Sequence, residues 1–313
     1  GAHTYYISWI IAVLYSLTGR SILMAHSISL LVGVSTIYIG CSLVRKLWGE
    51  NTAIKAGWVL SLFPTLILYS ALILREVYVV FFFIIALHGV VNWSRTLEIR
   101  SLLLALTGFI LATFFHGAMI IGGVVFLIIV FFQSFKKLIN SLLIRNSINI
   151  KHMVLVTSIT TAIFLIISSD VSVPKLGSFS NAINIEMLIE KIEELTTGSD
   201  GTVGASYPKI ATPSSINELF YKGPIRIAYF VFSPFPWDIR KTSQIIGLLD
   251  SFCYVALVII TLRNIKTIWN DPASRNILLL LISYIFVFGL LVGNYGVAIR
   301  HRSKFVFALI LLA

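Results

Sequence analysis

Long apolar segments with almost no charged residues constrain this chain more than any other feature. Residues 22–43, 77–91 and 277–292 contain no Asp, Glu, Lys or Arg. A helix of about 20 apolar residues crosses the roughly 30 Å hydrocarbon layer of a bilayer. These segments reach that length if the shorter helices extend a few residues beyond the apolar run. Hydrophobic residues make up 58% of the 313 positions and charged residues 12%, which excludes an ordinary soluble domain. An all-α, polytopic transmembrane helical bundle is predicted.

Hydropathy along the chain predicts about nine or ten spans, some of them short or broken. The predicted spans cover residues 5–17, 22–43, 53–74, 77–91, 102–115, 119–132, 153–168, 245–262 and 277–292, and another begins near Phe305. Because proline lacks a backbone N–H, Pro64 predicts a kink or break inside the third span. We assign residues 1–169 and 242–313 to transmembrane helices of one membrane domain, and residues 170–241 to a long extracytoplasmic loop. The chain opens with Gly1 and stops inside an apolar run, so both ends are expected to be truncated.

The distribution of Lys and Arg among the short loops predicts the orientation, since cytoplasmic loops carry an excess of these residues. One side receives Arg45, Lys46, Lys55, Arg95, Arg100, Lys136, Lys137, Arg145, Lys151, Arg263, Lys266 and Arg275. This side is predicted to be cytoplasmic. The opposite face then carries the turns at Arg20, Arg75 and His116, the long loop, and residues 294–304. We therefore expect the candidate chemistry on the extracytoplasmic face.

The extracytoplasmic loop is predicted to contain short helices that fold against the bundle. Apolar residues recur at helical spacing through residues 185–195, which predicts an amphipathic helix. The Gly, Ser and Thr content of residues 196–206 predicts a mobile connection. Ser215 followed by Glu218 fits a capping box, so a second short helix is expected to start there and to run toward the aromatic residues 229–232.

Arg75 and Glu76 are the first candidates for a functional site. They follow an apolar run, and charges at such a depth are costly unless they pair with one another or serve a site. Adjacent helical positions point in different directions and need not satisfy each other. A functional role is favoured, and a structural ion pair that closes a turn is the alternative.

A stronger candidate is the run of basic residues near the end of the chain. Arg300, His301, Arg302 and Lys304 place four basic side chains at an outer membrane boundary, where they repel one another. Arg offers a rigid fork of donors suited to phosphate oxygens, and Lys adds a compact positive charge. Phosphate binding is predicted here. Attraction to anionic lipid headgroups is the alternative.

Further candidates lie at other outer positions. His116 and Arg20 are predicted to join the phosphate-binding residues, with hydrogen-bonded packing as the alternative for the histidine. Trp237 and Asp238 close an aromatic, proline-rich loop. An interfacial anchor is one role of such aromatics, and sugar contact through ring stacking and hydroxyl hydrogen bonds is the other. Asp250 lies inside a span, where a helix-packing role is favoured over the lining of a polar cavity.

Several functional classes lack their characteristic residues. The chain has no Walker loop, no Gly-rich dinucleotide turn, no HExxH sequence and no paired His or Cys at metal spacing. Neither a metal nor a cofactor is predicted. The net charge of +11 comes from basic residues spread over many loops, so a nucleic-acid partner is not predicted. Cys41 and Cys253 fall in apolar segments, where free cysteine behaves as a small hydrophobe.

Three groups of residues combine into a recognisable pattern. They are Leu62-Phe63-Pro64 with Ser70 and Arg75-Glu76 downstream, the loop Ser233-Pro-Phe-Pro-Trp-Asp238, and the closing Asn294, Tyr295, Gly296 and Arg300-His-Arg302. Together they resemble bacterial integral-membrane glycosyltransferases of the GT-C type. Within this group the chain looks most like polysaccharide-polymerase proteins of O-antigen or exopolysaccharide biosynthesis.

The resemblance implies transfer of sugar from a polyprenyl-phosphate or diphosphate-linked donor to a saccharide or lipid acceptor. It implies a bacterial inner membrane, an active outer face, and a role in cell-surface polysaccharide biosynthesis. Glu76, or an acidic residue outside this chain, is expected to be the catalytic base, and Arg300, Arg302 and Arg75 are expected to stabilise the departing phosphate. The alternatives are a flippase or transporter of lipid-linked oligosaccharides, and a scaffold of an envelope assembly complex.

Overall fold

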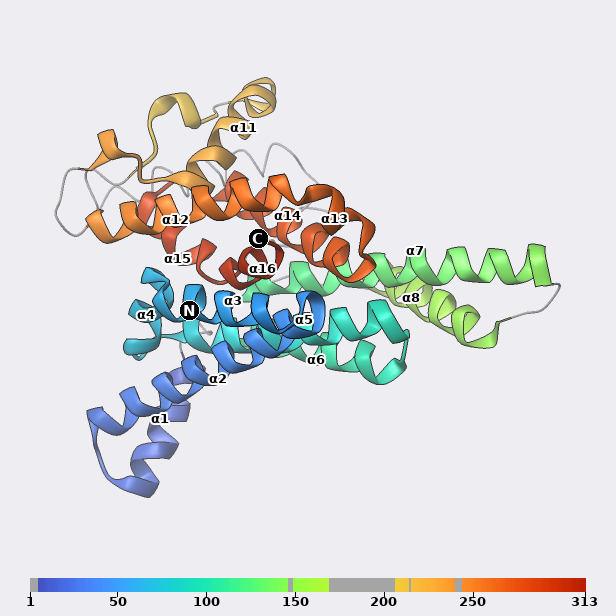
Figure 1. Ribbon diagram of the computed structural model, residues 1–313, viewed down its shortest axis with the longest axis horizontal. Helices are drawn as coiled ribbons and strands as arrows, with labels where there is room; N and C mark the ends of the chain where they lie inside the picture. The colour runs from blue at the N-terminus through green and yellow to red at the C-terminus, as the bar shows by residue number, and fades with distance from the viewer. Residues whose placement is uncertain (1–4, 146–148, 169–205, 214, 240–243) are drawn as a thin grey trace.

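The computed structural model describes residues 5–145, 149–168, 206–213, 215–239 and 244–313, which form helices joined mostly by short turns (Figure 1). The α-helices are α1 (Tyr5–Thr18), α2 (Ile22–Trp48), α3 (Glu50–Leu62), α4 (Pro64–Ala71), α5 (Arg75–Thr96), α6 (Ile99–Phe115), α7 (Ile120–Arg145), α8 (Ile150–Ser168), α11 (Ile216–Phe232), α12 (Gln244–Arg263), α13 (Ile265–Asn270), α14 (Pro272–Leu291), α15 (Tyr295–Arg302) and α16 (Val306–Leu312). Short 3₁₀ turns are η2 (Gly117–Met119), η3 (Lys209–Ala211) and η4 (Pro236–Asp238). The described residues contain no β-strand, which confirms the predicted all-α class.

Five helices in the described part of the chain are long and apolar enough to cross a membrane. They are α2, α5, α7, α12 and α14. The bent pair α3 and α4 becomes a sixth if it is counted as one span. These lengths and compositions are those of an integral membrane protein.

The described residues thus contain fewer long helices than the nine or ten predicted spans. The apolar helices Tyr6–Thr18, Ile99–Phe115 and Ile150–Leu165 are shorter than 18 residues. The run that begins near Phe305 forms α16, and all seven of its side chains are buried among other helices. The helix predicted to begin near Phe305 is thus present, and it starts at Val306.

The predicted break at Pro64 is confirmed. α3 ends at Leu62, Phe63 has an extended backbone, and Pro64 occupies the first turn of α4. The two helices are bent by 59° at this point. Proline is tolerated in a first helical turn, where its missing N–H would have no intrahelical partner.

Helix α5 is the centre of the bundle, with thirteen buried residues among its 22. It packs closely on α6, because a Cβ atom at Gly89 would lie 2.4 Å from the backbone nitrogen of Ala105, and one at Gly108 would lie 2.6 Å from that of Ala86. Small residues allow helix backbones to approach in this way.

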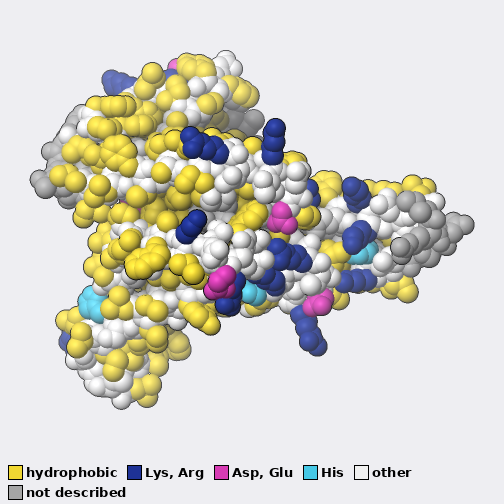
Figure 2. All heavy atoms as spheres, in the orientation of Figure 1, with side chains coloured by type: hydrophobic (Ala, Val, Ile, Leu, Met, Phe, Trp, Pro, Cys, Tyr) yellow, Lys and Arg dark blue, Asp and Glu magenta, His cyan; other side chains and the backbone are white. Residues whose placement is uncertain are grey.

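The two ends of α5 have different surroundings. At its C-terminal end, Lys46 donates a hydrogen bond to Asn92, Arg95 donates to the carbonyl of Lys46, and Lys151 donates to the carbonyl of Leu97. Basic loops that the orientation argument placed on one side therefore lie together. In Figure 2, Lys and Arg side chains are denser on the right half of the face in view than on the left half, where hydrophobic side chains predominate. The N-terminal end of α5 lies about 33 Å away along the helix axis and carries Arg75 and Glu76.

The helix predicted after Ser215 is present and longer than expected. Ser215 Oγ accepts a hydrogen bond from Glu218 N at 3.3 Å, and α11 then runs for 17 residues to Phe232. The amphipathic helix predicted at residues 185–195 and most of the connection predicted at residues 196–206 lie outside the described residues.

Candidate functional site

The short helix α15 presents its basic residues to two different surroundings. Its N-terminus is capped by Asn294, whose Oδ1 accepts hydrogen bonds from Gly296 N at 2.9 Å and Val297 N at 3.4 Å. Arg300 and Arg302 are two positions apart, which corresponds to about 200° around a helix. The two guanidinium groups therefore point to nearly opposite sides and contact different carboxylates.

Arg300 contacts Glu76 at the start of α5. Arg300 Nε donates a hydrogen bond of 2.6 Å to Glu76 Oε1, and the Glu76 side chain has no exposed surface. The other carboxylate oxygen, Oε2, is buried and accepts no hydrogen bond from the described residues. A buried carboxylate oxygen without a donor is costly, which makes this atom a candidate for substrate contact.

Other donors near Glu76 also remain available. Arg75 Nε lies 3.6 Å from Glu76 Oε1 and makes no hydrogen bond with a described residue. Arg300 has 42% of its side-chain surface exposed, and only its Nε group donates a hydrogen bond within the part of the chain that the structure describes. Its two Nη groups are therefore free to bind an anion.

Two histidines and a lysine complete this group of side chains. Lys304 Nζ lies 2.8 Å from His301 Nδ1. Since an ammonium group can only donate, Nδ1 must be the acceptor. Burial and the positive charge of Lys304 lower the pKa of His301 well below its usual range, so the imidazole is neutral at pH 7. The rings of His301 and His116 are 5.0 Å apart, which brings the end of α6 to the same place.

We call Arg75, Glu76, His116, Arg300, His301 and Lys304 the cationic cluster. Among the described residues, the charges of both Arg75 and Arg300 lie next to one carboxylate, that of Glu76. The imbalance favours an anionic ligand.

Arg302 belongs to a separate, fully buried network. Its Nε and Nη2 donate to Asp250 Oδ2 at 2.9 and 2.7 Å, and its Nη1 donates to the carbonyls of Val231 and Ser233 at 2.9 and 2.5 Å. Its Nη2 also donates to Ser251 Oγ at 3.0 Å. Every nitrogen of this guanidinium thus has a protein acceptor. Arg302 joins α15 to α11 and α12, which is the helix-packing role that was favoured for Asp250.

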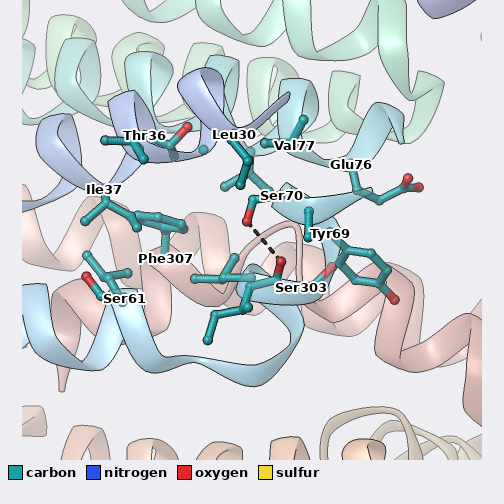
Figure 3. Close-up of a pocket in the computed structure, with 17 residues that line it drawn as sticks. Leu30, Thr36, Ile37, Ser61, Tyr69, Ser70, Glu76, Val77, Ser303 and Phe307 are labelled. Atoms are coloured by element: carbon teal, nitrogen blue, oxygen red, sulfur yellow. Dashed lines mark hydrogen bonds between the residues drawn. The ribbon is translucent and has the colours of Figure 1, made fainter. Parts of the chain in front are cut away.

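A pocket of about 140 Å³ lies beside the cationic cluster, between α2, α3, α4, α5 and the turn after α15. Its walls are mostly apolar. Glu76 and Tyr69 lie toward one end, and Thr36, Ile37 and Phe307 lie toward the other (Figure 3). Three large apolar lining residues are exposed: Leu30 at 46%, Val34 at 62% and Ile67 at 49%. Part of the pocket wall therefore also contributes to the apolar outer surface of the bundle.

The remaining predicted site residues lie apart from the cationic cluster. Arg20 is exposed in the turn between α1 and α2. It lies about 20 Å along the helix from Gly33, which packs against Ser70 and lines the pocket. Trp237 and Asp238 are in η4, on the other side of α15, within a group of aromatic rings.

Comparisons of this chain with protein-family models, with curated proteins and with solved structures found no match. The resemblance to GT-C glycosyltransferases therefore remains a resemblance of motifs. Among the described residues, no group of three or more His, Cys, Asp or Glu side chains is placed to hold a metal ion.

Sequence reasoning missed how these residues are paired. An Asp inside an apolar span almost always has a partner, so Asp250 was a signal that one of the basic residues after position 299 is structural. No pattern in the sequence indicated the pocket or the position of Tyr69 beside it. The pocket forms only because the break at Pro64 turns α4 against α2.

Proposed function

We propose that this chain is a membrane-embedded glycosyltransferase that transfers sugar from a polyprenyl-phosphate or diphosphate-linked donor to a saccharide or lipid acceptor. The observation that carries the proposal is the position of Glu76. Its buried Oε2 accepts no hydrogen bond from a described residue, its Oε1 accepts one from Arg300, and Glu76 lies at one end of a mostly apolar pocket. A substrate with a lipid chain and a phosphate group matches these surroundings.

The roles of the residues follow from the chemistry of glycosyl transfer. The acceptor oxygen forms a bond to the anomeric carbon of the donor sugar, and the bond from that carbon to the phosphate oxygen breaks. Glu76 takes the proton of the acceptor hydroxyl. The departing phosphate keeps the electron pair and gains negative charge, which the Nη groups of Arg300 and the guanidinium of Arg75 stabilise.

Arg302 is left out of this mechanism. Each of its nitrogens already donates to Asp250, Ser251 or a backbone carbonyl. A double substitution of Arg300 and Arg302 would mix a change in the site with a change in folding. Single substitutions of Glu76 and Arg300 separate the two effects.

The test is elongation of a lipid-linked saccharide by the purified full chain in lipid nanodiscs. Glu76→Gln is expected to lower the rate of transfer by about 10²–10⁴-fold, the usual contribution of a general base. Arg300→Gln is expected to lower it by about 10²–10³-fold, as for loss of one oxyanion donor. Arg20→Gln is the matched control, because it removes an exposed Arg outside the cationic cluster. Full transfer by Glu76→Gln would refute the proposal. Movement of the lipid across the membrane of proteoliposomes without elongation would indicate a flippase.

A further inference from the structure

Five aromatic side chains meet at the end of the bundle that carries α15. They are Tyr207, Tyr229, Phe235, Trp237 and Tyr295, which we call the ring cluster. Neighbouring ring centroids lie 4.9 to 5.4 Å apart, from Trp237 through Phe235, Tyr229 and Tyr207 to Tyr295. The ring cluster joins η4 to α11 and α15. Tyr207 is held there because its backbone N–H donates to the carbonyl of Gly293 at 2.9 Å.

Exposure increases from one end of the ring cluster to the other. Tyr207 and Tyr295 are 5% and 6% exposed, whereas Trp237 is 72% exposed. The Trp237 indole stacks on Phe235 with an angle of 5° between the rings and 4.9 Å between the centroids. One face of the indole is therefore covered by Phe235, and the other is open. The packed Phe235 ring thus supports the Trp237 ring, whose outer face is flat and open. We call these two stacked rings the platform.

A carboxylate and several phenol groups lie at the edge of this platform. Asp238 Oδ2 accepts a hydrogen bond from the backbone N–H of Phe235 at 3.2 Å, which fixes the carboxylate beside the rings. Burial and the charge of Asp238 raise the pKa values of Tyr229 and Tyr295. The Tyr295 phenol is hydrogen-bonded to Asp238 and the Tyr229 phenol to Trp237, so these polar groups are held together at the edge of the rings.

This combination differs from a simple interfacial anchor. An anchor needs an aromatic ring with one polar atom at the headgroup level. Here an open ring face, a fixed carboxylate and phenol groups lie together, as in sites that position a ligand by an apolar wall and a few polar groups. Sugars match such a site, because a pyranose ring has an apolar face of C–H groups and an edge of hydroxyl groups.

Helix α15 connects the platform to the cationic cluster. Tyr295 and Arg300 are both on this helix, five residues apart, which is about 7.5 Å along the axis and about 140° around it. We propose that the ring cluster, with Asp238, is a carbohydrate subsite that binds the sugar residues of the acceptor while its terminal hydroxyl lies near Glu76. The role as acceptor subsite rests on the proposed function, but binding of carbohydrate by the ring cluster does not.

The experiment measures binding of the full chain in lipid nanodiscs to an array of immobilised neutral and acidic oligosaccharides. Trp237→Ala is expected to weaken the strongest binding by about tenfold or more, as for loss of a central aromatic contact. Asp238→Asn weakens it as well, and Trp237→Phe, which keeps a ring, recovers part of it. Trp269→Ala is the matched control, because Trp269 is 51% exposed on α13 near the basic loops. It leaves binding unchanged.

The outcomes separate this inference from the proposed function. Glu76→Gln is expected to lower the rate of transfer by about 10²–10⁴-fold and to keep carbohydrate binding. Three results would overturn the carbohydrate subsite: no oligosaccharide binds the unsubstituted chain, Trp237→Ala binds as tightly as that chain, or Trp269→Ala weakens binding equally. If Trp237→Ala loses binding but Glu76→Gln retains full transfer, the subsite stands and the proposed function fails.

Discussion

Arg302 and Asp250 form an ion pair in which neither side chain has any exposed surface. Their 2.7 Å contact joins α15 to α12 across 52 positions of the chain. Thr65 Oγ1 donates to the other carboxylate oxygen, Oδ1, at 2.7 Å, so α4 is attached as well. The guanidinium carbon of Arg302 also lies 4.7 Å from the centre of the Tyr254 ring. This network holds the short helix that presents Arg300 to Glu76.

Removing the carboxylate of Asp250 is expected to destabilise the protein strongly. Asp250→Ala leaves the Arg302 charge buried without its partner, a change that typically costs about 3–5 kcal/mol. Arg45→Ala is the control, because its 3.7 Å pair with Glu50 is mostly exposed and is expected to change stability by about 0–1 kcal/mol. Reversible unfolding in detergent with increasing denaturant measures both. Equal effects of the two substitutions would contradict a structural role for the buried pair.

The close approach of α5 and α6 predicts that one added methyl group is destabilising. Gly89→Ala places a Cβ atom against the backbone of Ala105, and overpacking of this kind costs about 1–3 kcal/mol. Replacing Gly by Ala gains about 1 kcal/mol in helix propensity. At the upper end of its range, the cost of overpacking is larger than this gain, so the net effect is destabilising.

Gly123→Ala on α7 is the matched control. Its Cβ would meet Phe109 at 3.4 Å, the near edge of ordinary contact, so it is expected to be neutral or slightly stabilising. The same unfolding measurement compares the two variants. A stabilised Gly89→Ala protein would show that the helices separate without cost.

The environment of His301 predicts a loss of stability at mildly acidic pH. Its pKa in the folded protein is lowered from about 6.5, so the unfolded chain binds more protons between the two pKa values. The free energy of unfolding therefore falls as pH decreases below about 6.5. The charges that face His301 are those of Lys304, Arg300, Arg75 and, when protonated, His116.

His301→Gln is expected to flatten this dependence, because glutamine does not titrate. Thermal unfolding at pH 7.5 and pH 5.5 gives the two values to compare. His26→Gln is the control, since His26 contacts the carbonyl of Ala71 away from the cationic cluster. If His301→Gln loses as much stability between the two pH values as the unsubstituted chain, another group causes the dependence.

The distribution of Lys and Arg among the loops predicts that cysteines at the two ends of the bundle react with a membrane-impermeant reagent from opposite sides of the membrane. In a chain with Cys41 and Cys253 replaced by Ala, a cysteine at Val297 on α15 is expected to react with a membrane-impermeant maleimide added to intact cells. A cysteine at Lys266 on α13 is expected to react only after the membrane is permeabilised. Both positions are exposed, Val297 at 42%. The reverse result would place the cationic cluster in the cytosol and remove the basis of the proposed function.

The sequence by itself determined the helical class, the break at Pro64 and the start of α11 at Ser215. Each of these is a local consequence of residue type: apolar length, a missing backbone donor, and a side chain that caps a helix. It also singled out Arg75, Glu76 and Arg300 as residues that needed partners. These properties depend on residues that are close together in the sequence, so they can be derived without knowing how the helices pack.

Only the tertiary structure decided which carboxylate each arginine contacts and which apolar helices face protein. Glu76 and Arg300 are 224 positions apart, and their pairing depends on how α15 docks against α5. The apolar side chains of α16 are all buried, which their composition alone does not reveal. Long-range pairing and burial arise from the simultaneous packing of many helices, and no local pattern of residues encodes them.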